Sequence, residues 1–77
     1  MDTELVRIES MVDYRLVMLW LMDLGCEPVL SKRGRDEYRF HVTRAGNHWS
    51  DGSTRFEACE HSVNGWIEAG MPKEGSS

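Results

Sequence analysis

The sequence has few cysteines, no long hydrophobic run and fewer basic than acidic side chains. Its two cysteines, Cys26 and Cys59, lie far apart and are too few for the disulfide framework of small secreted domains. The first four residues include two acids, Asp2 and Glu4, and no base, whereas a secretory signal begins with basic residues followed by an apolar stretch. We therefore expect a cytoplasmic protein whose cysteines are reduced.

The longest uninterrupted apolar run covers only residues 16–22. A helix needs about 20 apolar residues to span a bilayer, so neither a membrane span nor a membrane partner is expected. The 77 residues are enough for one domain. A domain of this size buries only about 60% of the surface that its unfolded chain exposes, so association with another chain would stabilise it.

The 13 acidic residues outnumber the 9 basic ones, and the net charge is −4. This balance differs from that of proteins that coat nucleic acid or bind anionic membranes. The charge is unevenly distributed, because five bases fall within one short central segment: Lys32, Arg33, Arg35, Arg39 and Arg44. The chain therefore has a basic centre between acidic ends.

Residues 3–24 have the pattern of a first helix. Asp2 or Thr3 can cap its start, and Gly25 can end it. Its apolar side chains form two rows at helical spacing. The first row consists of Leu5, Ile8, Val12, Leu16 and Leu19, and the second row consists of Met11, Tyr14, Met18 and Leu21. Since a surface helix needs only one apolar row, this helix is expected to be covered on two sides.

Three short strands are expected after this helix, at residues 27–33, 37–44 and 48–50. Residues 33–36 and 45–47 form the turns between them. Alternation along the middle strand places three apolar side chains on one face of the sheet: Tyr38, Phe40 and Val42. The opposite face is expected to stay exposed.

A second helix is expected from Thr54 to Gly70. Thr54 and Glu57 have the spacing of a capping box, and Gly70 suits the end of a helix. The apolar row of this helix consists of Phe56, Cys59, Val63, Trp66 and Ile67. Another face carries only small side chains: Ala58, Ser62, Gly65 and Ala69. We expect this small face to let the first helix approach closely.

The element order predicts an α+β fold, α-β-β-β-α, in which a three-stranded antiparallel sheet carries two helices on one face. Residues 1–70 form a single domain. The composition of residues 71–77 is that of a flexible C-terminal tail.

No residue pattern points to catalysis, a metal or a cofactor. The cysteines and histidines do not form the close-spaced pairs of metal sites. Cys59 and His61 are near neighbours, but on a helix their side chains point about 200° apart. There is no nucleophile motif such as G-x-S-x-G. We therefore expect a protein that is not an enzyme and needs no cofactor.

The α-β-β-β-α order resembles the double-stranded-RNA-binding domain, which implies a nucleic-acid-binding alternative. That family contacts RNA with basic residues at the start of its second helix, where this chain has Arg55 as its single base, beside Glu57. The phosphate contacts would instead come from the basic hairpin: Lys32, Arg33, Arg35 and Arg39.

The segment from Trp49 to Ala58, followed by Trp66 and Ile67, resembles the strand, turn and helix of HicB-type antitoxins. This resemblance covers about 20 residues, and it implies an antitoxin-like regulator as a further alternative. The small size, acidity and architecture of the whole chain are similar to those of inhibitors encoded by phages and mobile elements, anti-CRISPR proteins among them. No residue motif carries this second resemblance.

Our leading hypothesis is a small, acidic, non-catalytic protein-binding module. It would inhibit a larger host protein or protein complex, such as one that handles nucleic acid, by masking its surface. The predicted protein-binding residues are the second row of the first helix and three acids of the second: Met11, Tyr14, Met18, Leu21, Glu57, Glu60 and Glu68. A further hypothesis from this pattern is a homodimer formed through the second row.

Overall fold

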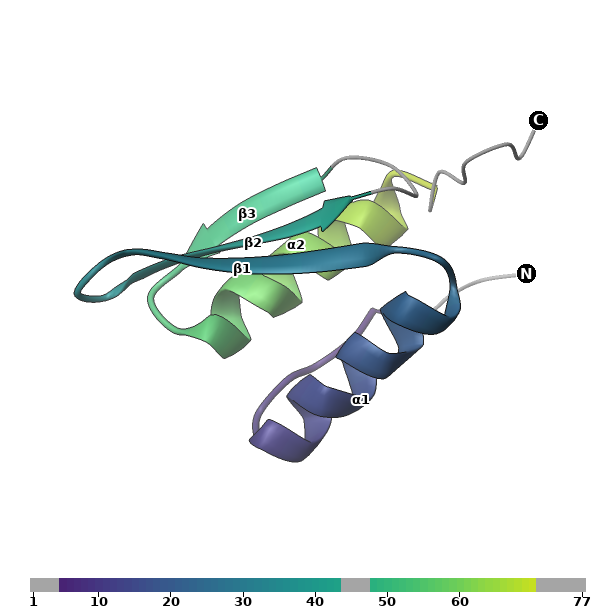
Figure 1. Ribbon diagram of the computed structural model, residues 1–77, viewed down its shortest axis with the longest axis horizontal. Helices are drawn as coiled ribbons and strands as arrows, with labels where there is room; N and C mark the ends of the chain where they lie inside the picture. The colour runs from purple at the N-terminus through teal and green to yellow at the C-terminus, as the bar shows by residue number, and fades with distance from the viewer. Residues whose placement is uncertain (1–4, 44–47, 71–77) are drawn as a thin grey trace.

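The computed structural model describes residues 5–43 and 48–70. Its elements are α1 (Met11–Asp23), β1 (Glu27–Gly34), β2 (Glu37–Thr43), β3 (His48–Gly52) and α2 (Arg55–Glu68). The strands form one antiparallel sheet in the order β1-β2-β3, and both helices lie on the same face of it (Figure 1). The predicted α-β-β-β-α fold is confirmed. The predicted turn at 45–47 and tail at 71–77 lie outside the described residues.

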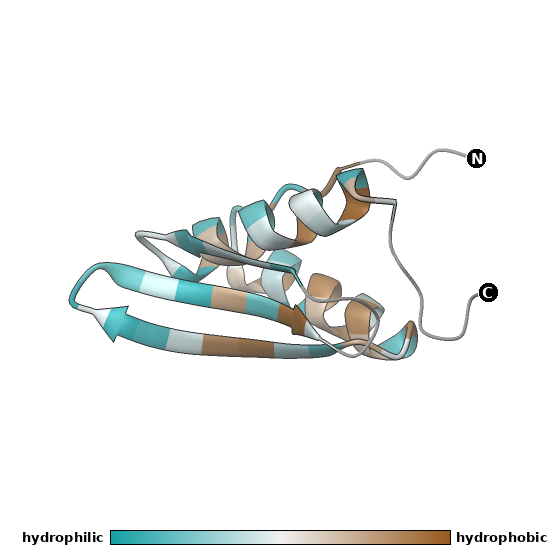
Figure 2. Ribbon diagram, turned by 90° about the horizontal axis from the view of Figure 1, so that it is seen from above, coloured by the Kyte–Doolittle hydropathy of each residue, from teal (hydrophilic) through white to brown (hydrophobic). Residues whose placement is uncertain are grey.

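The alternation predicted for β2 separates a buried face of the sheet from an open one. Phe40 and Val42 are fully buried beneath the sheet. On the opposite face the register aligns Val29, His41 and Trp49 across the three strands. The hairpin of β1 and β2 is hydrophilic at its closed end and hydrophobic nearer the core (Figure 2).

The prediction for α2 holds from its start to its end. The Thr54 hydroxyl accepts a hydrogen bond from the Glu57 N–H at 3.0 Å, as an N-cap does. The apolar row lies in the core, where Cys59 and Val63 are fully buried. Gly70 follows the helix with a φ of +97°, a conformation that glycine adopts without steric cost.

The small face of α2 packs against β3. Ser62 donates from its Oγ to the carbonyl oxygen of His48 at 3.1 Å. A Cβ at Gly65 would overlap the His48 imidazole. Small side chains are needed here because α2 lies close beneath the last strand, so the pattern predicted a close contact but not its partner.

The first helix begins at Met11, eight residues later than predicted from residue 3. Ser10 caps it, since its Oγ accepts from the Asp13 N–H at 3.2 Å, and Asp13 accepts from the Glu9 N–H at 3.0 Å. Capping by a serine and a carboxylate three residues later competes with helix upstream. Residues 5–9, the described residues before the cap, form no regular element.

Residues 5–9 lie along α2, whose side chains hold their backbone. The Asn64 side chain accepts from the Val6 N–H at 2.7 Å and donates to the Val6 carbonyl at 3.0 Å. The Glu60 carboxylate accepts from the Ile8 N–H at 2.8 Å. These contacts satisfy backbone groups that no strand pairs with, and they place Ile8 in the core.

The core covers part of the second row of α1, which was the row predicted to bind a partner, and it leaves most of the first row exposed. Val12, Leu16 and Leu19 from the first row are 65%, 59% and 61% exposed, whereas Tyr14 and Leu21 from the second row are buried. The predicted phase of the helix depended on Leu5 and Ile8, and the structure places both before its start. Without these two residues the first row can bury less apolar surface than the second row. The second row, together with Val17, packs against the core.

Candidate protein-binding surface

The structure divides the second row between the core and the surface. Leu21 is fully buried, and Tyr14 packs edge-on against Phe40 with the ring centroids 6.5 Å apart. Tyr14 and Leu21 therefore cannot form a protein-binding surface as predicted. Met11 remains 42% exposed and Met18 is partly buried, so these two methionines still reach the surface.

Two of the three predicted acids are used within the fold. The Glu57 carboxylate accepts from both the N–H and the Oγ of Ser53, each at 2.7 Å. These hydrogen bonds hold the pKa of Glu57 below its ordinary value. Glu60 is half-buried and holds Ile8, while Glu68 is exposed near the end of α2. The three acids thus do not form one free acidic face.

The largest exposed apolar surface on a described element lies on α1. Val12, Leu16, Leu19 and Met22 recur at helical spacing, and each is more than half exposed. We call these four residues the outer face of α1. The sequence showed the spacing, but it gave no means of deciding which row the core would take.

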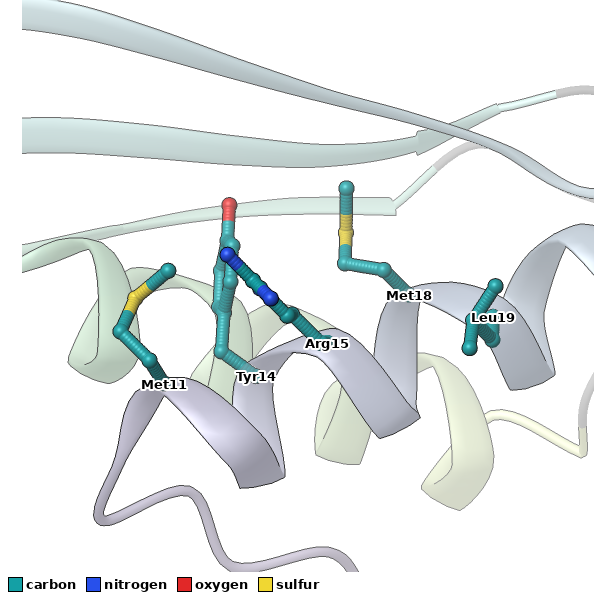
Figure 3. A pocket seen from close by; sticks show the side chains of 5 residues that line it. All are labelled: Met11, Tyr14, Arg15, Met18 and Leu19. Atoms are coloured by element: carbon teal, nitrogen blue, oxygen red, sulfur yellow. The ribbon is translucent and has the colours of Figure 1, made fainter.

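A groove adjoins the outer face where α1 lies below the strands. Its volume is about 340 Å³, and it is lined by Met11, Tyr14, Arg15, Met18 and Leu19. Figure 3 shows the Met11, Tyr14 and Met18 side chains directed from α1 toward the strands. Burial raises the pKa of the Tyr14 hydroxyl. The groove is therefore an apolar, methionine-lined surface with one cation, Arg15, beside it.

Some basic side chains of the hairpin of β1 and β2 already contact other side chains of the fold. Arg39 donates to Asp51 at 2.8 and 3.3 Å, and its guanidinium lies 4.0 Å from the centre of the Trp49 ring. The hydrogen bond from Arg39 lowers the pKa of Asp51. Lys32 lies 5.7 Å from the centre of the Tyr38 ring. Arg39 is thus paired with Asp51 within the sheet, and its predicted role as a phosphate contact stays a prediction.

The two cysteines are buried and reduced. Burial raises the pKa of the Cys59 thiol to about 12, so it carries no charge at neutral pH. Across residues 5–43 and 48–70, no three histidine, cysteine or acidic side chains gather closely enough to hold a metal ion. Within the same residues, neither helix has the length and apolar character to cross a membrane.

No protein-family model, curated protein or solved structure matches this chain. The resemblances to HicB-type antitoxins and to inhibitors of phages and mobile elements rest on the sequence and stay predictions.

Proposed function

We propose that this chain is a non-catalytic protein-binding module and that the outer face of α1 contacts its partner. The observation that supports the proposal is that α1 is apolar on opposite sides. Tyr14 and Leu21 are buried in the core, while Leu16 and Leu19 are 59% and 61% exposed. A helix that is apolar around its circumference is normally covered on all sides, and large exposed apolar patches mark interaction sites.

The energetics favour this surface over the acidic one. Complete burial of a leucine side chain contributes about 1.5–3 kcal/mol. A partner that covers Leu16 and Leu19 therefore gains a substantial part of this binding free energy from each of the two side chains. Binding by Glu57 or Glu60 would compete with the hydrogen bonds that each makes to Ser53 or Ile8. The proposed contact is therefore apolar at its centre.

We propose that the module acts as an inhibitor that masks a surface of a larger host protein. A helix face held by a packed core presents its side chains in a fixed arrangement, which lowers the entropic cost of binding. Masking requires no reacting group, only a partner with a complementary apolar surface. The exposed Glu68 on α2 is left free to interact with a basic partner at its rim.

Affinity capture from a native host lysate tests this proposal. The tagged protein is compared with Leu16→Glu, and nuclease is added to half of each sample. A protein that co-purifies in both halves with the wild type and is depleted about tenfold or more by Leu16→Glu supports it. Leu5→Glu is a matched control, because Leu5 is 53% exposed but lies outside α1. Equal recovery with all three proteins contradicts the proposal.

A second candidate function, nucleic-acid binding, is favoured by Trp49 on the open face of the sheet. Trp49 is 50% exposed, and exposed aromatic rings beside cations can stack on unpaired bases. Arg33 and Arg35 are exposed where β1 turns into β2, and Arg33 is close enough to Asp51 to help lower its pKa. Arg33→Glu combined with Arg35→Glu should then abolish a gel shift of a single-stranded probe at low salt. Absence of any shift with the wild type removes this candidate.

A further inference from the structure

β1 is an unpaired edge of the sheet within the described residues. The strand order β1-β2-β3 leaves one side of β1 without a hydrogen-bonding neighbour, and β1 forms one long border of the molecule in Figure 2. It spans eight residues, compared with five for the other edge, β3. Long edges readily pair with another chain, so proteins usually protect them with charge, proline or a covering segment.

The centre of this edge has little of that protection. Pro28 and the irregular register between Lys32 and Gly34 lie toward its two ends. Between them are Val29, which is 43% exposed, and the partly buried Leu30. The helix that carries the groove, α1, packs against β1, and the Met11 and Met18 side chains of the groove are directed toward the strands (Figure 3).

The charges of β1 are complementary to those of a second β1 strand that runs antiparallel to it. Glu27 is at its start, and Lys32 and Arg33 are at its end, all three exposed. If a second β1 pairs with it antiparallel around Leu30, each Glu27 lies beside the basic end of the other copy. Opposite charges across strands stabilise such a pair and like charges destabilise it. A parallel arrangement would place like charges together.

From this combination we infer that a second copy of this chain binds along β1. The two β1 strands pair antiparallel, which joins the two sheets into one of six strands, and the grooves of the two copies meet beside the joint. The interface is isologous, as in most homodimers. Val12 and Leu16 do not line the groove, whereas Leu19 belongs to both surfaces. This interface goes beyond the proposed contact with another protein and leaves Val12 and Leu16 available to it.

Two charge variants and their mixture test this interface by sedimentation velocity at low salt. Glu27→Lys makes both ends of β1 basic, and Lys32→Glu combined with Arg33→Glu makes both ends acidic. We expect a wild-type dimer, monomers for each variant alone, and a dimer in the equimolar mixture, where acidic ends again meet basic ends. Since the changed side chains are exposed, each variant should keep the wild-type circular dichroism spectrum.

A wild-type protein that stays monomeric up to its solubility limit overturns the inference, and so do variants that dimerise as well as the wild type. The result is separable from that of the lysate capture. If the protein is a monomer and its capture of a host protein depends on Leu16, only the inference of a second copy at β1 is overturned. A dimer that obeys the charge pattern while capture ignores Leu16→Glu overturns only the proposed function.

Discussion

Asn64 is the residue whose role was least visible in the sequence. It falls on the polar side of α2, where an asparagine is ordinarily solvated. In the structure its amide both accepts from and donates to the backbone of Val6. Neither partner lies within 50 positions of the other in the chain, so no local pattern reports this contact. The structural role of Glu60 could not be predicted for the same reason, because its hydrogen bond to Ile8 joins distant segments of the chain.

Asn64→Ala should therefore lower the free energy of unfolding by about 1–3 kcal/mol. The variant leaves the half-buried N–H and carbonyl of Val6 without partners, and such groups cost about this much. Urea denaturation followed by circular dichroism measures the change. His61→Ala is the control on the same helix, since His61 is exposed. If the two variants are equally stable, the Asn64 contacts do not hold residues 5–9.

Replacing Gly65 by alanine is expected to destabilise the fold, which is the opposite of the usual effect of this change in a helix. In an exposed helix a Gly→Ala change stabilises by about 1 kcal/mol. Here the added Cβ would overlap the His48 ring, so Gly65→Ala should instead destabilise by about 1–3 kcal/mol through overpacking. Combining it with His48→Ala removes the obstructing ring and should recover stability relative to the sum of the single changes. Strict additivity would show that α2 does not pack against β3 as described.

Cys59 gives the protein a dependence on alkaline pH. Its folded pKa of about 12 lies above the ordinary value of 9.0. Between these values the unfolded chain loses the thiol proton while the folded chain keeps it, so the free energy of unfolding falls as pH rises from 9 toward 12. Urea titrations at several pH values should show that the free energy of unfolding declines less with rising pH in Cys59→Ala than in the wild type. Identical slopes would place Cys59 in contact with water.

At the scale of elements, β2 and α2 could be predicted because their signals are local. The alternation of Tyr38, Phe40 and Val42 and the cap at Thr54 need no information from elsewhere in the chain. The start and phase of α1 could not be predicted in this way, because both rows are apolar. Which row enters the core is decided by Phe40 on β2 and by Phe56 and Trp66 on α2, which come together only when the helix packs against the sheet.

The phase of α1 is testable by substitutions on its opposite sides. Leu16→Glu should change the free energy of unfolding by about 0.5 kcal/mol or less, because Leu16 is 59% exposed. Leu21→Ala should cost about 2–5 kcal/mol, because Leu21 is fully buried. Chemical denaturation of the two variants provides the comparison. A severe loss in Leu16→Glu would mean that the first row is the core row.

At the scale of the whole molecule, the described helices and strands leave three surfaces uncovered among residues 5–43 and 48–70. They are the outer face of α1, the edge of β1 with its groove, and the open face of the sheet around Trp49. Composition predicted that a domain this small would benefit from association. The location of these surfaces depends on how α1 is oriented over the sheet, and this follows from long-range packing that the residue pattern does not encode.

The claim that the outer face of α1 binds another protein is tested most directly by site-specific cross-linking. A photoreactive amino acid is placed at position 16, and in a parallel sample at position 61 on the exposed side of α2, and each protein is illuminated in native host lysate. We predict a defined adduct, heavier than two copies of the chain, from position 16 and not from position 61. Equal adducts from both positions, or none from position 16, would contradict the account.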